Sequence, residues 1–96
     1  SMEDSRARVT AITTRLQDFL ACISNESEEI REWLPWKHWK KYDGFEVDLD
    51  EIRFEFIDIL IFTIEAMVYL GMDENDIHFY YTSKMKENNR RQSEGY

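Results

Sequence analysis

The stretch FEFIDILIFTIEAMVYL, residues 54–70, is the longest apolar run in the chain, and it decides which folds are open to it. It carries three carboxylates: Glu55, Asp58 and Glu65. Each charged side chain at the centre of a bilayer costs roughly 2.5–3.5 kcal/mol, which argues against a membrane-spanning helix. The stretch is therefore interpreted as a helix that is buried inside protein on most of its sides.

Capping signals place the ends of this helix. Asp48 and Glu51 have the spacing of a capping box, so the helix is predicted to begin at Asp48. Gly71 suits the position just after a helix, so the predicted end is about Leu70. A helix over 48–70 is apolar nearly all round. Either its own neighbours wrap it fully or, as we expect, part of it contacts a second subunit.

Three further helices are predicted, which gives an all-α bundle of about four helices. One covers residues 5–23, where apolar side chains recur at spacings of three and four. The next begins near Ser24 or Asn25 and ends at about Leu34, because Pro35 disfavours helical geometry in the residue before it. The last covers residues 73–90 and is followed by a tail.

Composition narrows the class of protein. The chain has 96 residues, 15% of them aromatic, with three Gly and one Pro, so we expect a single helical domain over residues 1–96 with a mobile tail at 91–96. Ser1 before Met2 is interpreted as a cloning remnant. The net charge of −8 argues against a nucleic-acid or anionic-membrane partner. A single cysteine, Cys22, allows no intrachain disulfide, so a reducing, cytoplasmic location is expected.

Two pairs of carboxylates suggest a metal site. Glu55 and Asp58 lie one helical turn apart inside the apolar stretch, and Glu26 and Glu29 repeat that spacing. Buried carboxylates without partners are costly, and two such pairs on facing helices would repel each other strongly without a cation. Oxygen ligands of this kind suit Mg²⁺, or Mn²⁺. The alternative for Glu26, Glu29 and the neighbouring Glu28 and Glu32 is a solvated acidic face.

The spacing of these carboxylates resembles a family signature. Glu26-x-x-Glu29, 25 intervening residues and Glu55-x-x-Asp58 resemble the pattern of the all-α nucleotide pyrophosphohydrolases, which include MazG proteins, dimeric dUTPases and dCTP pyrophosphatases. The stretch PWKHWK at 35–40 is similar to a motif of dimeric dUTPases. So is the spacing K-x-x-x-N-x-x-R-Q-x-x-G-Y at 84–96.

Other features of the sequence leave details of the resemblance open. Only 25 residues separate Asp58 from Lys84, which is the compact size of MazG-like proteins and leaves the base specificity open. An alternative register, Glu28-Glu29-x-x-Glu32, also fits the MazG motif. The Glu26 and Glu29 register is preferred because its offset to the PWKHWK stretch then matches the family.

The resemblance implies a Mg²⁺-dependent enzyme that splits a (deoxy)nucleoside triphosphate, dUTP before dCTP, into monophosphate and pyrophosphate, as housecleaning of nucleotide pools. It also implies a homodimer or higher homo-oligomer. The expected metal ligands are Glu26, Glu29, Glu55 and Asp58, with Glu26 or Glu29 as general base. Expected phosphate contacts are Lys37, Lys40, Lys84 and Arg91, and expected base or sugar contacts are Trp36, Trp39, Asn88 and Tyr96. The rival readings are a hydrolase of loose base preference and a non-catalytic helical interaction module.

Overall fold

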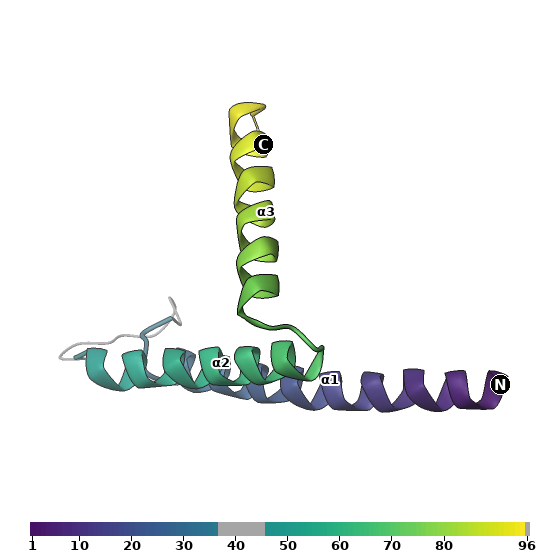
Figure 1. Ribbon diagram of the computed structural model, residues 1–96. Coiled ribbons are helices and arrows are strands. Elements are labelled where there is room, and N and C mark those ends of the chain that lie inside the picture. The colour runs from purple at the N-terminus through teal and green to yellow at the C-terminus, as the bar shows by residue number, and fades with distance from the viewer. Residues whose placement is uncertain (37–45, 96) are drawn as a thin grey trace. The chain divides into compact units, whose positions relative to one another are not determined.

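The computed structural model describes residues 1–36 and 46–95, and within these ranges it contains three α-helices and no strand (Figure 1). They are α1 (Met2–Glu32), α2 (Leu49–Tyr69) and α3 (Glu74–Ser93). The chain divides into two compact units, Ser1–Ala66 and Met67–Tyr96, and each is described by itself. The all-α prediction is confirmed, with three helices in place of about four.

The difference in helix number arises in α1, which runs unbroken through the predicted junction near Asn25. The assignment of Asn25 as a helix N-cap was therefore wrong. The sequence contains no Gly or Pro before residue 35 that would interrupt the helix. The Ser27 hydroxyl donates to the Ile23 carbonyl oxygen at 2.9 Å, so this polar side chain is satisfied inside the helix. The helix ends at Glu32, two residues before the predicted end.

The predicted boundaries of α2 are confirmed to within a residue. At its start, the Asp48 carboxylate accepts a hydrogen bond from the Glu51 backbone N–H at 3.1 Å. At its end, Gly71 has φ +77° and donates to the Val68 carbonyl oxygen at 2.9 Å, while the Met72 N–H donates to the Met67 carbonyl oxygen at 3.1 Å. This pair of bonds is a Schellman motif, which needs the left-handed residue that Gly71 supplies.

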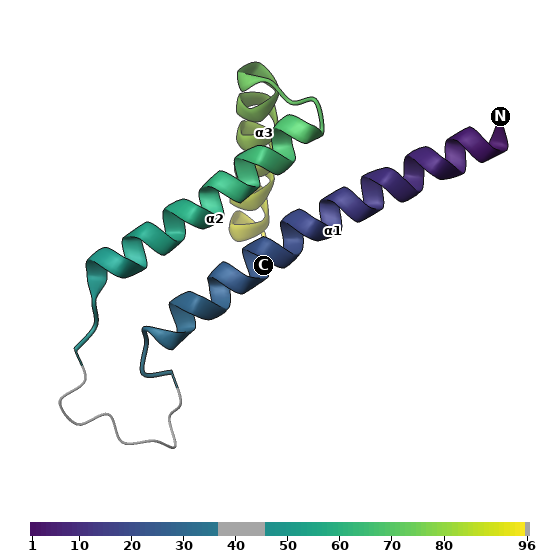
Figure 2. The same cartoon turned by 90° about the horizontal axis from the view of Figure 1, so that it is seen from below.

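The first unit is an antiparallel helical hairpin. Figure 2 shows α1 and α2 side by side, with α1 extending past the pairing at its N-terminal end. Phe19 and Ile30 on α1 are each 7% exposed, and they are the two buried side chains of the described ranges. At about 1.5 Å per residue, α1 is roughly 46 Å long, well beyond the reach of its partner helix. Accordingly, residues 2–15 of α1 are all exposed.

One face of α2 is apolar and exposed. Phe54, Ile57, Ile61, Ile64 and Val68 follow each other at spacings of 3, 4, 3 and 4 residues, and their exposed fractions range from 41% to 67%. That spacing puts them on one stripe of the helix. Within the described residues, α2 thus has an apolar surface that stays exposed, and its expected contact with a second subunit remains a prediction. Within the described residues, none of the three helices is long and apolar enough to cross a membrane.

In the second unit, α3 begins with a reciprocal capping box. The Asp73 carboxylate accepts from the Asp76 N–H at 2.9 Å, and the Asp76 carboxylate accepts from the Asp73 N–H at 3.0 Å. The helix continues to Ser93, three residues beyond the predicted end, and is closed by Glu94. Arg90 donates to the Glu94 carboxylate at 2.6 Å, which ties the last turn to the one before it. Three residues of the expected tail are therefore helical.

Candidate metal centre

The hairpin brings three of the four predicted ligands together. One carboxylate oxygen from each of Glu26, Glu29 and Glu55 lies within 4.8 Å of the other two. Glu26 and Glu29 share a side of α1 because they are one turn apart, and Glu55 approaches from α2. Glu26 and Glu55 are half-buried, whereas Glu29 is exposed. The group therefore has an interior part and a side open to solvent.

Two oxygens of this group lack hydrogen-bond donors. Glu26 Oε2 and Glu55 Oε2 are buried, and neither accepts a hydrogen bond from any residue of 1–36 or 46–95. A hydrogen bond with Glu55, followed by the negative charge of Glu55, raises the pKa of Glu29. A hydrogen bond with Glu26, followed by desolvation, raises the pKa of Glu55. Two carboxylates can share such a bond only when one of them holds a proton, so the group favours either a proton or a cation.

Asp58, the fourth predicted ligand, lies one turn beyond Glu55 and is half-buried. It is not among the three carboxylates that meet within 4.8 Å. Its negative charge nonetheless raises the pKa of both Glu29 and Glu55, so it lies close enough to repel them. The four carboxylates form one electrostatic group, with Asp58 at its edge.

The arrangement fits a hard divalent cation. It offers oxygen ligands from two helices, which is how helical bundles hold such ions, and two of those oxygens have no other partner. The nearby arginines neutralise other groups: Arg31 pairs with Glu28 at 3.8 Å, and Arg53 pairs with Asp50 at 2.9 Å. Arg31 and Arg53 are thus paired outside the carboxylate group.

The geometry favours the Glu26 and Glu29 register over the alternative. Glu28 is exposed and turned toward Arg31, and Glu32 is exposed and lies outside the three-carboxylate group. In a helix, residue 28 projects about 130° from the side shared by residues 26 and 29, and residue 32, one turn beyond Glu29, projects about 120° from Glu26. Of the residues in the two registers, Glu26 and Glu29 are the ones that meet Glu55 of α2.

Just past the end of α1, Trp36 stacks on Arg31. The guanidinium carbon of Arg31 lies 4.4 Å from the centroid of the Trp36 ring, and Trp36 is 41% exposed. Sequence reasoning missed Arg31, because the contact spans the helix end, where helical spacing no longer applies. Four other candidates lie outside the described residues: Lys37, Trp39, Lys40 and Tyr96.

The remaining candidates, Lys84, Asn88 and Arg91, are exposed along α3 in the second unit. Arg91 Nε lies 3.2 Å from Glu87 Oε1. Hydrogen bonds from Arg90 and then Arg91 hold the pKa of Glu87 below its ordinary value. Glu87 was not among the predicted site residues, although its spacing of three and four residues to the two arginines was a readable signal.

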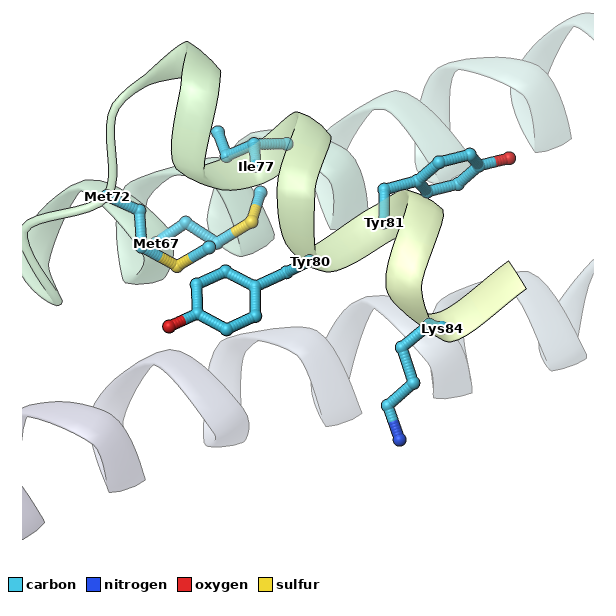
Figure 3. A pocket seen from close by; sticks show the side chains of 6 residues that line it. All are labelled: Met67, Met72, Ile77, Tyr80, Tyr81 and Lys84. Atoms are coloured by element: carbon cyan, nitrogen blue, oxygen red, sulfur yellow. The ribbon is translucent and has the colours of Figure 1, made fainter. Parts of the chain in front are cut away.

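The second unit also has a hollow of about 310 Å³ at the start of α3. Its lining is apolar apart from Lys84 at one side, and the lining residues are Met67, Met72, Ile77, Tyr80, Tyr81 and Lys84. Figure 3 shows the two methionine side chains directed toward each other, with the Tyr80 ring beside them. Lys84 is thus exposed at the edge of an apolar depression.

The chain is similar in sequence to two curated phage proteins. The chain is 35% identical over 94 residues to a dCTP pyrophosphatase of Enterobacteria phage LZ5, and the match covers 88% of this chain and 54% of that protein. It is 38% identical over 71 residues to the dCTP pyrophosphatase of Enterobacteria phage T4, covering 64% of this chain and 42% of that protein. The chain is a distant homologue of these phage enzymes.

This homology has a limited extent. The chain spans about half the length of the curated relatives that it matches. No protein-family model matches the chain. No solved structure matches it significantly.

Proposed function

We propose that the chain is a Mg²⁺-dependent pyrophosphohydrolase that converts a deoxynucleoside triphosphate to its monophosphate and pyrophosphate, with Mn²⁺ as a possible substitute metal. The observation that carries this proposal is the meeting of Glu26, Glu29 and Glu55, with two oxygens that lack donors. Distant homology to dCTP pyrophosphatases supports the reaction class. The same homology supports dCTP as the proposed substrate ahead of dUTP, the reverse of the order expected from the sequence.

The chemistry follows from charge. A nucleoside triphosphate carries about four negative charges, so carboxylates bind it through cations and not directly. Glu26, Glu29, Glu55 and Asp58 would hold the metal, which supplies polarisation of phosphoryl oxygens and a water of lowered pKa. Glu29, the exposed member of the group, or Glu26 then accepts the proton of the attacking water.

The other candidate residues divide between phosphate and base. Basic side chains suit phosphate oxygens on the side away from the metal, and aromatic or amide side chains suit the base or sugar. The proposed phosphate contacts are Lys37, Lys40, Lys84 and Arg91, and the proposed base or sugar contacts are Trp36, Trp39, Asn88 and Tyr96. The exposed indole of Trp36, stacked on Arg31, offers an aromatic surface of the required kind.

The enzyme is further proposed to be a homodimer or higher homo-oligomer. The support is the exposed stripe of α2, Phe54 to Val68, whose 3-4-3-4 spacing is typical of a seam between helices. Sedimentation equilibrium at micromolar concentration should give about twice the chain mass of 11.7 kDa. A folded species of the chain mass would contradict the dimer. Replacing Ile57 and Ile64 by Asp should dissociate it.

A substrate panel tests the activity. Pyrophosphate release is measured with Mg²⁺ and dCTP, dUTP, dTTP, dATP or dGTP, and dCTP should be hydrolysed fastest. Equal rates with all bases would favour the reading of loose base preference. Absence of release, together with no calorimetric binding of Mg²⁺ or Mn²⁺, would favour the non-catalytic helical module.

A matched pair of variants tests the ligand register. Glu29 belongs to both registers, so Glu26→Gln and Glu32→Gln separate them. Under the proposal Glu26→Gln loses activity and Glu32→Gln keeps it, because Glu32 is exposed outside the carboxylate group. The opposite result would return the assignment to Glu28, Glu29 and Glu32.

A further inference from the structure

The side of α1 that carries Glu26 and Glu29 also carries a cationic side chain, Arg15, closer to the N-terminus. Each residue of an α-helix advances the side-chain direction by about 100°, so Glu26 and Glu29 point within roughly 20° and 40° of Arg15. Cys22 lies between them on the same side. Arg15 therefore shares a face with the carboxylate group, although it stands three turns away in the chain.

Arg15 is fixed on the hairpin by a contact with its core. Its guanidinium carbon lies 4.7 Å from the centroid of the Phe19 ring, and Phe19 is one of the two buried side chains. A cation over an aromatic face is held in place by the ring quadrupole. No ion pair joins Arg15 to a carboxylate within residues 1–36 and 46–95. The chain has a net charge of −8, yet this exposed guanidinium is in no ion pair of the described residues. Its N–H groups are therefore available to bind an external anion.

The separation suits a polyphosphate. Eleven residues from Arg15 to Glu26 correspond to about 16 Å along the helix. A triphosphate chain joined to carboxylates through a cation, at about 2.1 Å from each oxygen, covers a separation of this order together with the flexible Arg15 and Glu26 side chains.

We propose that Arg15 binds the terminal phosphates of the substrate, the part that leaves as pyrophosphate. The proposal rests on the proposed function. The planar guanidinium matches phosphate oxygens with two parallel hydrogen bonds, which fits the phosphate end better than the base end. Trp36, the described candidate for base stacking, lies at the other end of α1, so the phosphate chain extends from the carboxylates toward Arg15.

This assignment predicts selection by phosphate number. A nucleoside triphosphate would reach both the carboxylate group and Arg15, whereas a monophosphate would reach only the first. Arg15 is thus a binding residue for the leaving group and a determinant of triphosphate specificity. Sequence reasoning placed the phosphate contacts elsewhere, because the shared face of Arg15 and Glu26 becomes visible only once α1 is one continuous helix.

Calorimetric titration of the full chain with pyrophosphate in the presence of Mg²⁺ tests the proposal. Arg15→Gln should weaken pyrophosphate binding by about 10- to 100-fold, since hydrogen bonds between charged groups are lost. Binding of Mg²⁺ alone and of dCMP with Mg²⁺ should stay within about twofold of the original chain. Arg15→Lys, which keeps the charge but loses the planar fork, should lie between the two.

Arg6→Gln is the matched control. Arg6 is also an exposed arginine of α1, but nine residues before Arg15 it points to the opposite side of the helix. It should bind pyrophosphate like the original chain. Equal pyrophosphate affinity in Arg15→Gln and the original chain would overturn the proposal, and so would a loss of dCMP binding in place of pyrophosphate binding.

Hydrolysis assays separate this inference from the function on which it rests. An original chain that releases no pyrophosphate from any nucleotide contradicts the proposed function. An active chain whose Arg15→Gln variant has an unchanged KM and kcat for dCTP contradicts the role of Arg15 alone.

Discussion

Carboxylates lie one helical turn from other charged side chains in two regions of this chain, and the charge of those neighbours is opposite in the two regions. On the hairpin, Glu29 and Glu55 lie against other carboxylates, and the pKa of each is raised. On α3, Glu87 lies against Arg90 and Arg91, and its pKa is lowered. The spacing is the same, but one group is left short of positive charge and the other is neutralised within its own helix. Of these two regions, the first is the one short of positive charge, which is why we propose the metal site there.

The largest effect expected from this comparison is on activity. Glu55→Gln should lower kcat by ~10²-fold or more, because it removes a metal ligand from the carboxylate group. Without metal, the same change removes repulsion, so thermal stability should be unchanged or higher. Asp58→Asn is expected to follow the same direction. Glu87→Gln on α3 is the control and should keep metal-dependent turnover. Wild-type activity in Glu55→Gln would remove the metal assignment.

Metal binding should produce the next largest effect. Mg²⁺ should raise the melting temperature, and a non-hydrolysable triphosphate analogue should raise it further, because ligands that bind the folded state stabilise it by mass action. The double variant Glu26→Gln, Glu29→Gln should lose the shift. A shift of unchanged size in that variant would place the metal outside the hairpin.

Removal of residues 91–96 tests the α3 region of the comparison, where Arg91 pairs with Glu87. The segment carries Arg91, which is proposed to contact phosphate and is now held by Glu87. We expect KM for the nucleotide to rise by about tenfold and kcat to fall, because a charged hydrogen bond to phosphate is lost. Metal affinity should stay the same, since the carboxylate group is in the other unit. Unchanged kinetics would show that Arg91 only stabilises the end of α3.

The smallest effects are in the pH dependence of stability. Raised pKa values at Glu29 and Glu55 mean that the folded state holds protons more tightly than the unfolded state there. Their contribution to stability is thus present at and below the ordinary value of 4.5 and is lost as pH rises through the folded pKa. Glu87 has the opposite sign: its contribution is present above 4.5 and is lost as pH falls through its lowered pKa.

Thermal melts without metal between pH 3 and pH 8 would separate these terms. Glu55→Gln should flatten the decline toward neutral pH, and Glu87→Gln should flatten the decline toward acid. If both variants changed the same limb of the curve, the two regions would not differ in the way described here.

Local features were predictable because they depend on neighbouring residues. Asp48 and Gly71 bound α2 through a carboxylate cap and a left-handed residue, and both act within one turn of the helix. The junction at Asn25 failed for the complementary reason. A residue that suits an N-cap is also tolerated inside a helix, and the apolar stripe that continues to Ile30 stabilises the unbroken helix.

The sequence by itself determined that the chain is helical and that Glu26 and Glu29, like Glu55 and Asp58, share a side of their helix, because helical spacing fixes those directions. Only the tertiary structure decided which carboxylates meet. The packing of α1 on α2 around Phe19 and Ile30 turns Glu26 and Glu29 toward Glu55 and leaves Glu28 and Glu32 in solvent. Spacing along a helix gives direction, but the distance between side chains on two helices depends on which faces pack together.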